Sequence, residues 1–394
     1  MGNITSYLKE NGDITFVEKE MGPVDALILA QLAYFNFDGI VPDVSSEKSA
    51  VSLTDIRQYI DYQNLFAVNW YKDELRELFE LLIASRRYHT MKVNYYENHI
   101  DEQKQAQFCA VTFFLGDGSI VVAFRGTDDA LSGWKEDFNM AYMTPVPSQE
   151  MSVNYMEQIE KKLQRNRKAK IFFTGHSKGG NLAVYSAIHC GKRFQNRINT
   201  VYNFDGPGFR PEFWEQMNYE VVKGKIRKLI PQSSFVGMIM QQNEEYEVIA
   251  SNATGMLQHL PLAWRVTGDD FVYLEKLDES RRVLNDEINE WILSLDKEEL
   301  STFLETVYYL IDCTNASTLK ELGENWLGSL IAIGSGYKKN RFEEKSREIF
   351  WESVNLLLKL LVEDGTEKIR RSGILQSVRE RLEEVEIKHF VEKN

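Results

Sequence analysis

Cysteine is scarce in this sequence, which holds only Cys109, Cys190 and Cys313 among 394 residues. The three are widely spaced and odd in number, and no CxxC pair occurs, so neither a disulfide framework nor a cysteine-based metal site is expected. This usage favours a reducing compartment, and we expect a cytoplasmic protein. Cys109 and Cys190 are flanked by apolar residues and are expected to be buried thiols.

Basic charge and long apolar runs are also lacking. Lysine and arginine number 46 against 59 aspartate and glutamate residues, and the resulting net charge of −13 argues against a nucleic-acid partner. No apolar run is long enough to span a bilayer, and residues 1–6 lack the regions of a signal peptide, so stable membrane insertion is not expected. The chain does have 43% hydrophobic and 12% aromatic residues, which is enough to bury a sizeable core.

The rest of the chain is organised around residues 171–187. Residues 171–174 are apolar or β-branched and predict a short buried strand, residues 175–179 read Gly-His-Ser-Lys-Gly, and residues 181–187 suit a helix. A Gly-x-Ser-x-Gly turn between a strand and a helix is typical of a nucleophile elbow, which lifts the serine hydroxyl above the sheet. A plain tight turn is the alternative, but the flanking strand and helix favour Ser177 as a nucleophile. Gly175 and Gly179 are expected where a Cβ would collide with a neighbouring element.

Strand-like and helix-like segments alternate through most of the chain. Runs of β-branched and aromatic residues predict strands, and apolar residues at i, i+3, i+4 and i+7 predict helices. The predicted strands are 91–96, 107–115, 119–124, 171–174, 200–205, 225–231 and a pair of runs up to about residue 251; the predicted helices are 24–34, 71–85, 153–163 and 181–187. The alternation predicts an α/β fold with a mostly parallel central sheet and helices on both faces.

The pattern changes beyond residue 271. Helical spacing recurs there, as in Phe303, Leu304, Val307 and Ile311, and no strand-like alternation is found. We therefore expect an α/β domain over residues 1–271, irregular in its first 20 residues, and a helical C-terminal region over residues 272–394.

A serine nucleophile needs a histidine base, which comes last in the chain order serine, acid, histidine of this kind of elbow. His259 lies in a loop after the last strand-like run, where that base is expected. A loop histidine without a role is the alternative. His189 lies in the helix after the elbow and is interpreted as structural, and the side chain of His176 is expected to point away from the serine.

The acid that orients the base is harder to assign. Asp205 follows the predicted strand 200–205, and we interpret it as the acid, because the next strand is followed by Ser233 and Ser234 rather than by a carboxylate. The alternatives are a turn role for Asp205, fallback carboxylates at Glu244 and Glu245, and a dyad in which Ser233 or Ser234 bonds to the histidine.

Two backbone N–H groups are candidates for an oxyanion hole. One is that of Lys178, directly after the serine, and the other is that of Thr127, in the turn after the strand 119–124. The Thr127 hydroxyl can donate as well. Arg125 and Asp128 are interpreted as structural charges that hold this loop, and the residues that follow, Trp134, Glu136 and Asp137, have no clear role.

These motifs carry a resemblance to a known family. Residues 124–127, Phe-Arg-Gly-Thr, with the Gly-His-Ser-x-Gly-Gly of residues 175–180, resemble the class 3, fungal-type lipases of the α/β-hydrolase superfamily. Over roughly residues 20–270 the chain resembles an uncharacterised bacterial branch, often labelled Mbeg-like, in its segments 133–138, 203–208 and 258–259. The resemblance implies an α/β-hydrolase fold with Ser177 as nucleophile, His259 as base, and Thr127 with Lys178 as oxyanion hole. The sequence departs from the lipases at Lys178, where an apolar residue is usual, and in lacking an aspartate after the strand 225–231.

The sequence and the resemblance together predict a serine hydrolase that cleaves carboxylic esters or lipids through an acyl-enzyme, without metal or cofactor. One alternative is a scaffold with weak or no turnover whose helical tail binds a protein partner. Another is a thioesterase or acyltransferase that uses the same residues. The aromatic segment 211–222 is interpreted as a helix packed on the sheet, with a lid over an acyl site as the alternative.

Overall fold

The computed structural model describes residues 2–66, 72–101, 106–127, 136, 139–140, 143–217, 219–240, 245–296 and 298–300. The chain divides into two compact units, Met1–Glu290 and Trp291–Asn394, and the fold below is that of the first. The helices predicted beyond residue 300 lie outside the described residues, and the domain boundary at residue 271 stays a prediction. In the part of the chain that is described, no helix is long and apolar enough to cross a membrane.

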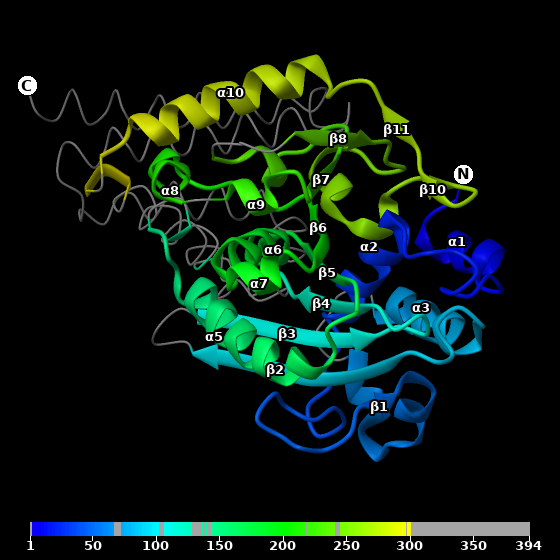
Figure 1. The fold of residues 1–394 in the computed structure, drawn as a ribbon. Coiled ribbons are helices and arrows are strands. Elements are labelled where there is room, and N and C mark those ends of the chain that lie inside the picture. The colour runs from blue at the N-terminus through cyan, green and yellow to red at the C-terminus, as the bar shows by residue number, and fades with distance from the viewer. Residues whose placement is uncertain are drawn as a thin grey trace, which may run out of the picture. The chain divides into compact units, whose positions relative to one another are not determined.

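Nine strands of the described residues form one mixed sheet, in the order β1-β2-β3-β4-β5-β6-β7-β8-β11 (Figure 1). The strands are β1 Val51–Ser52, β2 Lys92–Asp101, β3 Ala106–Phe114, β4 Ile120–Phe124, β5 Ile171–His176, β6 Ile198–Phe204, β7 Ile226–Pro231, β8 Tyr246–Ile249 and β11 Tyr273–Leu274. Strands β4 to β8 are parallel, β1 to β3 form an antiparallel edge that joins β4, and β11 is antiparallel to β8. This parallel centre confirms the predicted α/β fold, although β11 is a strand in a region where only helices were predicted. Strands β9 (Val266–Thr267) and β10 (Asp270–Phe271) form a separate pair.

Helices cover both faces of the sheet (Figure 1). They are α1 Ile4–Asn11, α2 Pro23–Leu32, α3 Lys72–Ala84, α5 Pro147–Lys162, α6 Lys178–His189, α7 Lys192–Gln195, α8 Pro211–Gln216, α9 Glu220–Lys223 and α10 Glu279–Ser294. Short 3₁₀ helices are Leu53–Gln58, Ile60–Phe66, Leu163–Arg165, Val236–Met238, Gly255–His259 and Pro261–Ala263. The four helices predicted before residue 271 are thus present, as α2, α3, α5 and α6, and α5 and α6 begin several residues earlier than predicted.

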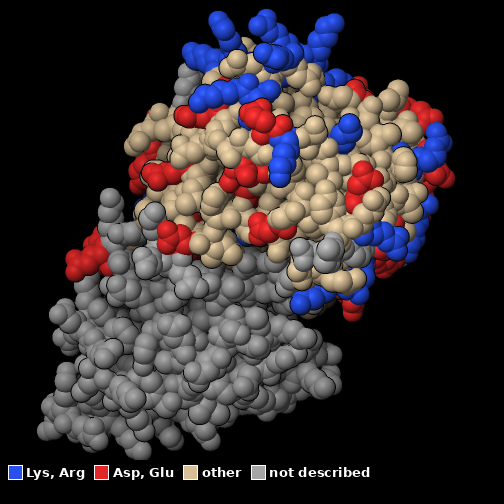
Figure 2. Space-filling view, turned by 90° about the horizontal axis from the view of Figure 1, so that it is seen from below, with Lys and Arg blue, Asp and Glu red and all other residues tan. Residues whose placement is uncertain are grey.

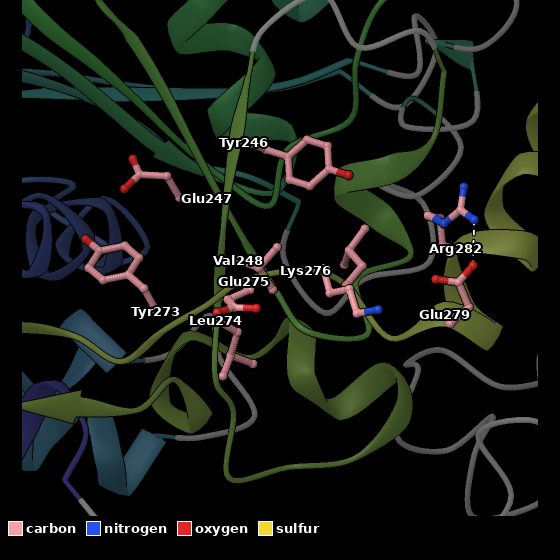
Figure 3. Close-up of a pocket in the computed structure, with 10 residues that line it drawn as sticks. Tyr246, Glu247, Val248, Tyr273, Leu274, Glu275, Lys276, Glu279 and Arg282 are labelled. Carbon is pink, nitrogen blue, oxygen red and sulfur yellow. Dashed lines mark hydrogen bonds and ion pairs between the residues drawn. The ribbon is translucent and has the colours of Figure 1, made fainter.

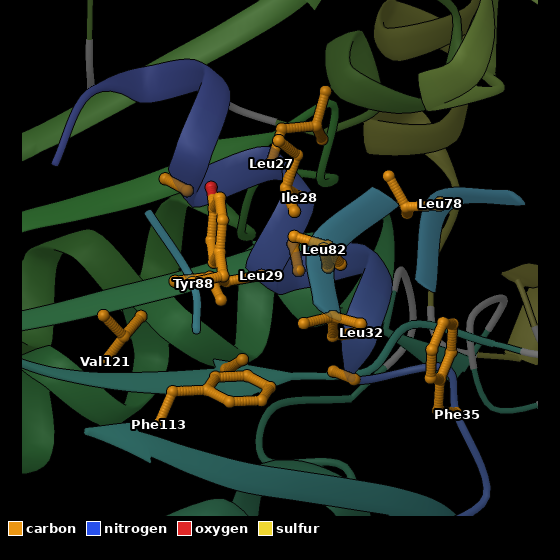
Figure 4. Close-up of a cluster of buried hydrophobic side chains, with 14 of the residues drawn as sticks. Leu27, Ile28, Leu29, Leu32, Phe35, Leu78, Leu82, Tyr88, Phe113 and Val121 are labelled. Carbon is orange, nitrogen blue, oxygen red and sulfur yellow. The ribbon is translucent and has the colours of Figure 1, made fainter. Parts of the chain in front are cut away.

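Alternate residues of β4 explain why the protein has a core on each side of the sheet. Val121 and Ala123 belong to one hydrophobic cluster with α1, α2 and α3, whereas Val122 and Phe124 belong to a second cluster with α5 and α6. Successive side chains of a strand point to opposite faces, so a strand buried on both faces is apolar throughout. Figure 4 shows the first cluster, which joins Leu27 and Leu29 of α2, Leu78 and Leu82 of α3, and Phe113 and Val121 of the sheet.

The prediction that the first 20 residues are irregular is wrong, because residues 4–11 form helix α1. The side chain of Asn3 accepts hydrogen bonds from the backbone N–H groups of Thr5 and Ser6, which caps the helix. Ile4, Tyr7 and Leu8 are buried on one face. The spacing is helical, but the segment is short, and packing on the first cluster is what stabilises it.

Helix α2 is buried on every side, as its mostly apolar sequence predicts. Its single charged residue, Asp25, is completely buried and accepts hydrogen bonds from Arg87, Tyr7 and Tyr88. A buried carboxylate is tolerated only when it is paired and hydrogen-bonded in this way. The cluster therefore ties α1 and the segment after α3 to α2.

The segment 211–222 contains the short helices α8 and α9, and α8 packs against α6. The choice between a helix packed on the sheet and a lid over an acyl site stays a prediction. Phe213 and Trp214 of α8 are buried in the second hydrophobic cluster, where Phe213 stacks on Tyr185 of α6 and on Phe209. The expected burial of two thiols is confirmed, since Cys109 and Cys190 are free and buried.

The surface of the described residues carries charges of both signs. On the face shown in Figure 2, Lys and Arg gather along the upper edge and one side, and Asp and Glu are scattered among uncharged residues.

Candidate active site

Ser177 lies in a sharp turn between β5 and α6. Its backbone has φ 57° and ψ −134°, an unusual conformation for a residue with a side chain, and the Ser177 N–H donates to the carbonyl of Phe204 on β6. A Cβ on Gly175 would lie 2.0 Å from the carbonyl oxygen of Gly179, and one on Gly179 would lie 2.2 Å from that of Phe124. The two glycines therefore permit the close approach of strand, turn and helix that a nucleophile elbow requires.

Asp205 and His259 are brought together although they are 54 residues apart in sequence. The distance from His259 Nδ1 to Asp205 Oδ2 is 2.6 Å, and the Asp205 side chain is 1% exposed. Asp205 follows the end of β6 and has φ 52°, and His259 ends the 3₁₀ helix Gly255–His259. Because Nδ1 faces the carboxylate, Nε2 is the ring nitrogen that can accept a proton from a serine.

The second carboxylate oxygen of Asp205 is held by the loop after β7. Ser234 Oγ donates to Asp205 Oδ1 at 2.5 Å, and the Gly237 N–H donates to the same oxygen at 3.1 Å. Ser234 therefore contacts the acid and not the histidine, and Ser233 Oγ donates to Asp278. The alternative in which Ser233 or Ser234 bonds to His259 is therefore not what the described residues form.

The fallback carboxylates are not part of this arrangement. Glu245 is exposed just before β8, and Glu244 lies outside the described residues. Asp205 is thus the sequence-derived acid that the fold places against His259.

His259 lies directly beside the nucleophile turn. His176, the residue before Ser177, has its Nε2 2.8 Å from the carbonyl oxygen of His259, and the two imidazole rings lie with centroids 4.5 Å apart. Among the described residues, no hydrogen bond joins the Ser177 hydroxyl to the His259 ring. Such contacts are often long in ligand-free active sites and tighten when substrate binds.

His176 is a buried, neutral histidine. Burial first, and then the neighbouring His259 ring, hold the pKa of His176 well below its ordinary value, against the opposing effect of its hydrogen bond to the His259 carbonyl. With Nε2–H as donor to that carbonyl, Nδ1 accepts from the Tyr34 hydroxyl at 3.3 Å. The His176 ring is thus bonded to Tyr34 and to the His259 backbone, and its direction away from the Ser177 hydroxyl stays a prediction.

The depressed pKa of His176 predicts a loss of stability in mild acid. The unfolded chain binds a proton at this residue below about pH 6.5, whereas the native protein does not, so the free energy of unfolding decreases as pH falls from 7 to 5. The contribution approaches about 1.4 kcal/mol per pH unit. Urea unfolding across this range should show a shallower dependence in His176→Gln, which cannot titrate. Equal slopes in the two proteins would contradict a neutral His176.

Thr127, the second oxyanion candidate, follows the carboxyl end of β4, next to β5. Strand β4 pairs with β5 in parallel, with Phe124 opposite Gly175. A Cβ on Gly126 would lie 3.2 Å from the Ser177 Cβ and 2.3 Å from the Tyr34 hydroxyl, so the chain before Thr127 passes close to Ser177. The Lys178 N–H belongs to the first residue of α6, at the positive end of the helix dipole.

The side chain of Lys178 forms a completely buried ion pair. Its Nζ lies 2.8 Å from Glu136 Oε2, and both side chains are 0% exposed. Glu136 also accepts from the backbone N–H groups of Gln107, at the start of β3, and Ser148, at the start of α5. The sequence interpretation left Glu136 without a role. The sequence signal for Glu136 is Lys178 itself, which stands where the lipases that the chain resembles usually have an apolar residue. A lysine buried at such a position requires a carboxylate as its partner.

Removing the lysine side chain should cost much stability. Lys178→Met keeps the length of the side chain but leaves the buried Glu136 carboxylate without its cation, and we expect a loss of about 3–5 kcal/mol in the free energy of unfolding. Urea unfolding of the variant and the wild-type protein measures this loss. The matched control is Lys9→Met, which removes an exposed pair with Glu77 and is expected to change stability by no more than about 1 kcal/mol. A similar small effect for both variants would contradict the buried pair, whereas Lys178→Met combined with Glu136→Gln should recover part of the loss.

The loop after Asp205 is held by buried amide side chains. Asn181 of α6 donates to the carbonyls of Pro207 and Gly208, and Asn203 of β6 accepts from the Gly206 N–H. These contacts account for the Asn-Phe-Asp-Gly-Pro-Gly segment 203–208, in which the flanking residues fix the turn that presents Asp205.

Of the segment 133–138 only residue 136 is described, and Asp128, Trp134 and Asp137 lie outside the described residues. Arg125 is buried and donates to Asn98, which agrees with a structural role.

A hollow of about 430 Å³ lies elsewhere, at the β8–β11 edge of the sheet (Figure 3). Acidic, basic and apolar side chains line it together: Tyr246, Glu247, Val248, Tyr273, Leu274, Glu275, Lys276, Leu277, Glu279 and Arg282. None of the candidate catalytic residues is among them. In the described residues, no group of His, Cys, Asp and Glu is arranged to hold a metal ion.

Solved structures similar to this chain share little sequence identity with it. Lipase II from Rhizopus niveus is 15% identical, with 52% of this chain and 83% of that chain covered and a TM-score of 0.34. The Rhizomucor miehei lipase–propeptide complex is 16% identical, with 52% and 71% covered and a TM-score of 0.34. An MDLA mutant from Penicillium cyclopium is 9% identical, with 63% and 83% covered and a TM-score of 0.37.

No curated protein matches the chain. A family model described as Mbeg1-like matches residues 82–309 of this chain, which is more than half of the chain. The matched residues include β3, the turn at Ser177, Asp205 and His259. The chain is therefore a member of the Mbeg1-like family.

Proposed function

We propose that this protein is a serine hydrolase that cleaves carboxylic esters through an acyl-enzyme. The observation that carries the proposal is the 2.6 Å contact between His259 Nδ1 and Asp205 Oδ2 beside a serine held at φ 57° between a strand and a helix. Nucleophile, base and acid come from three separate segments in the chain order of an α/β-hydrolase triad. A chance arrangement of these three residue types would not also place the serine at such a turn.

In the first half of the reaction, Ser177 Oγ attacks the ester carbonyl carbon. His259 Nε2 takes the hydroxyl proton, and Asp205 stabilises the imidazolium through the Nδ1–H contact. The carbonyl oxygen becomes an oxyanion, for which the Lys178 and Thr127 N–H groups are the donors. One such donor contributes about 2.7–4 kcal/mol of transition-state stabilisation. Collapse of the tetrahedral intermediate breaks the carbon–oxygen bond, and His259 passes its proton to the departing alcohol.

In the second half, water replaces the alcohol. His259 takes a proton from the water as it attacks the acyl carbon, and returns the proton to Ser177 Oγ when the acid product departs. The net reaction consumes one water and releases one alcohol and one carboxylic acid. Every group that this cycle uses belongs to the chain.

The scaffold alternative drew its support from the missing carboxylate after β7. In the fold, Asp205 after β6 takes the place beside His259, and the loop after β7 supplies Ser234 and Gly237 to hold it. That reason for expecting no turnover is therefore removed, and we favour hydrolysis of small esters or lipids.

The test is hydrolysis of p-nitrophenyl esters from acetyl to long acyl chains, together with labelling by a fluorophosphonate probe. We expect measurable turnover and stoichiometric labelling at Ser177, and the chain-length profile separates an esterase from a lipase. A protein that neither turns over any ester nor reacts with the probe would overturn the proposal.

A further inference from the structure

The loop between β7 and β8 holds the candidate acid in place. Its residues Ser234 and Gly237 are the donors to Asp205 Oδ1, while Oδ2 faces His259. The carboxylate plane is therefore fixed from both sides. If this loop moved, the oxygen that orients the His259 ring would move with it.

The loop depends on outside contacts for its shape. In its described residues, 232–240 and 245, the regular structure is the 3₁₀ turn Val236–Met238. Met240 has φ 66°, a left-handed conformation that is costly for a residue with a side chain. A conformation of this kind persists only where surrounding groups hold it.

Helix α10 supplies those contacts. Asn285 Nδ2 donates to the Ser234 carbonyl at 2.8 Å, Asn289 Nδ2 donates to the Met238 carbonyl at 2.6 Å, and Asn289 Oδ1 accepts from the Met240 N–H at 2.8 Å. The two asparagines are four residues apart, which places them on one face of the helix. Asn285 is 2% exposed, so its contact with the loop is made away from water.

The residue before α10 is hydrogen-bonded to the same loop. Asp278, directly before the helix, donates its N–H to the Gln232 carbonyl and accepts from Ser233 Oγ. Hydrogen bonds thus join α10 and its N-terminal flank to the loop at Gln232, Ser233, Ser234, Met238 and Met240. A helix with only a packing role would be expected to use apolar side chains on this face.

We propose that α10 is a positioning element of the active site, in which Asn285 and Asn289 hold the β7–β8 loop so that Ser234 and Gly237 orient Asp205 toward His259. The inference deepens the proposed hydrolase function and rests on it for its catalytic meaning. Asparagine contacts to two loop carbonyls and one N–H fix the backbone, the backbone fixes the Ser234 hydroxyl and the Gly237 N–H, and these fix the carboxylate. Residues remote from the reacting atoms can act in this way because a displacement of about 1 Å in a catalytic group costs about 10²-fold in rate.

The test is the double variant Asn285→Leu/Asn289→Leu, assayed for ester hydrolysis per fluorophosphonate-reactive serine. We expect kcat to fall by about 10- to 100-fold with little change in KM, because substrate contacts are not altered. The matched control on the same helix is Arg282→Ala, whose exposed side chain pairs with Glu279 and Asp286, and it should keep wild-type kcat. If the double variant fails to fold, Asn289→Asp replaces it, since this keeps the acceptor for the Met240 N–H and loses the donor to Met238; an intermediate fall in kcat is expected.

A second readout does not depend on turnover. In protein labelled with ¹⁵N-histidine, the Nδ1–H signal of His259, identified by its loss in His259→Gln, reports the contact with Asp205. We expect it to shift or broaden in the asparagine variants and to stay in place in Arg282→Ala. A folded double variant with wild-type kcat and an unmoved signal would overturn the inference and leave the hydrolase proposal intact. A wild-type protein without Ser177-dependent turnover would overturn the hydrolase proposal, and the signal alone would then decide whether α10 positions Asp205.

Discussion

Replacing Ser177 with alanine is expected to lower kcat for ester hydrolysis by about 10⁴–10⁶-fold, as in other serine triads. The substitution removes only the hydroxyl oxygen, so the acyl-enzyme cannot form, while the Cβ that the turn already accommodates at φ 57° is kept. The fold should be unchanged for the same reason. Ester turnover and fluorophosphonate labelling of the two proteins, measured side by side, check the expectation.

A matched control for Ser177→Ala lies on the same helix. Ser186→Ala removes the hydroxyl of another serine of α6 that is completely buried and whose oxygen has no hydrogen-bond partner among the described residues. It should keep wild-type turnover and labelling. Undiminished activity in Ser177→Ala would remove the elbow from the mechanism, and mapping of the probe adduct would then show which residue reacts.

Asp205→Asn is expected to lower kcat by about 10⁴-fold with little change in stability. Asparagine has the shape of aspartate, so its oxygen can still accept from Ser234 and Gly237. Its amide group then faces His259 Nδ1 and donates to it, which places the ring proton on Nε2. A ring in that tautomer cannot take the proton of the serine, and it also lacks the charge that stabilises the imidazolium.

The kinetic parameters of Asp205→Asn should show a fall in kcat without a matching rise in KM, since the acid does not bind substrate. The control is Glu245→Gln, which removes the exposed carboxylate that was the alternative acid and should leave kcat and KM unchanged. Wild-type activity in Asp205→Asn, or a large loss in Glu245→Gln, would show that the acid has been assigned to the wrong residue.

The features that the sequence determined by itself are local ones. A nucleophile elbow is encoded within about ten residues, because the strand, the two glycines that permit close approach, and the helix follow one another directly. Strand β4 is equally local: five apolar residues in a row indicate burial on both faces, which the two clusters confirm. The chain order of serine, acid and histidine expected for such an elbow then left His259 as the candidate base.

Tertiary structure decided the choices between residues that look alike in sequence. Asp205 and Glu245 both come near a strand, and only the fold brings one of them within 2.6 Å of His259. Helix α1 was missed because a helix of eight residues takes its stability from packing and capping, not from its composition.

The sequence also did not predict the buried counter-charge of Lys178 or the contacts of Asn285 and Asn289 with the loop between β7 and β8, because both depend on tertiary structure. Glu136 is 42 residues from Lys178, and Asn285 is 51 residues from Ser234. Hydrogen bonds and ion pairs of this kind act over about 3 Å, and a sequence specifies which groups are present but not which of them the folded backbone brings that close.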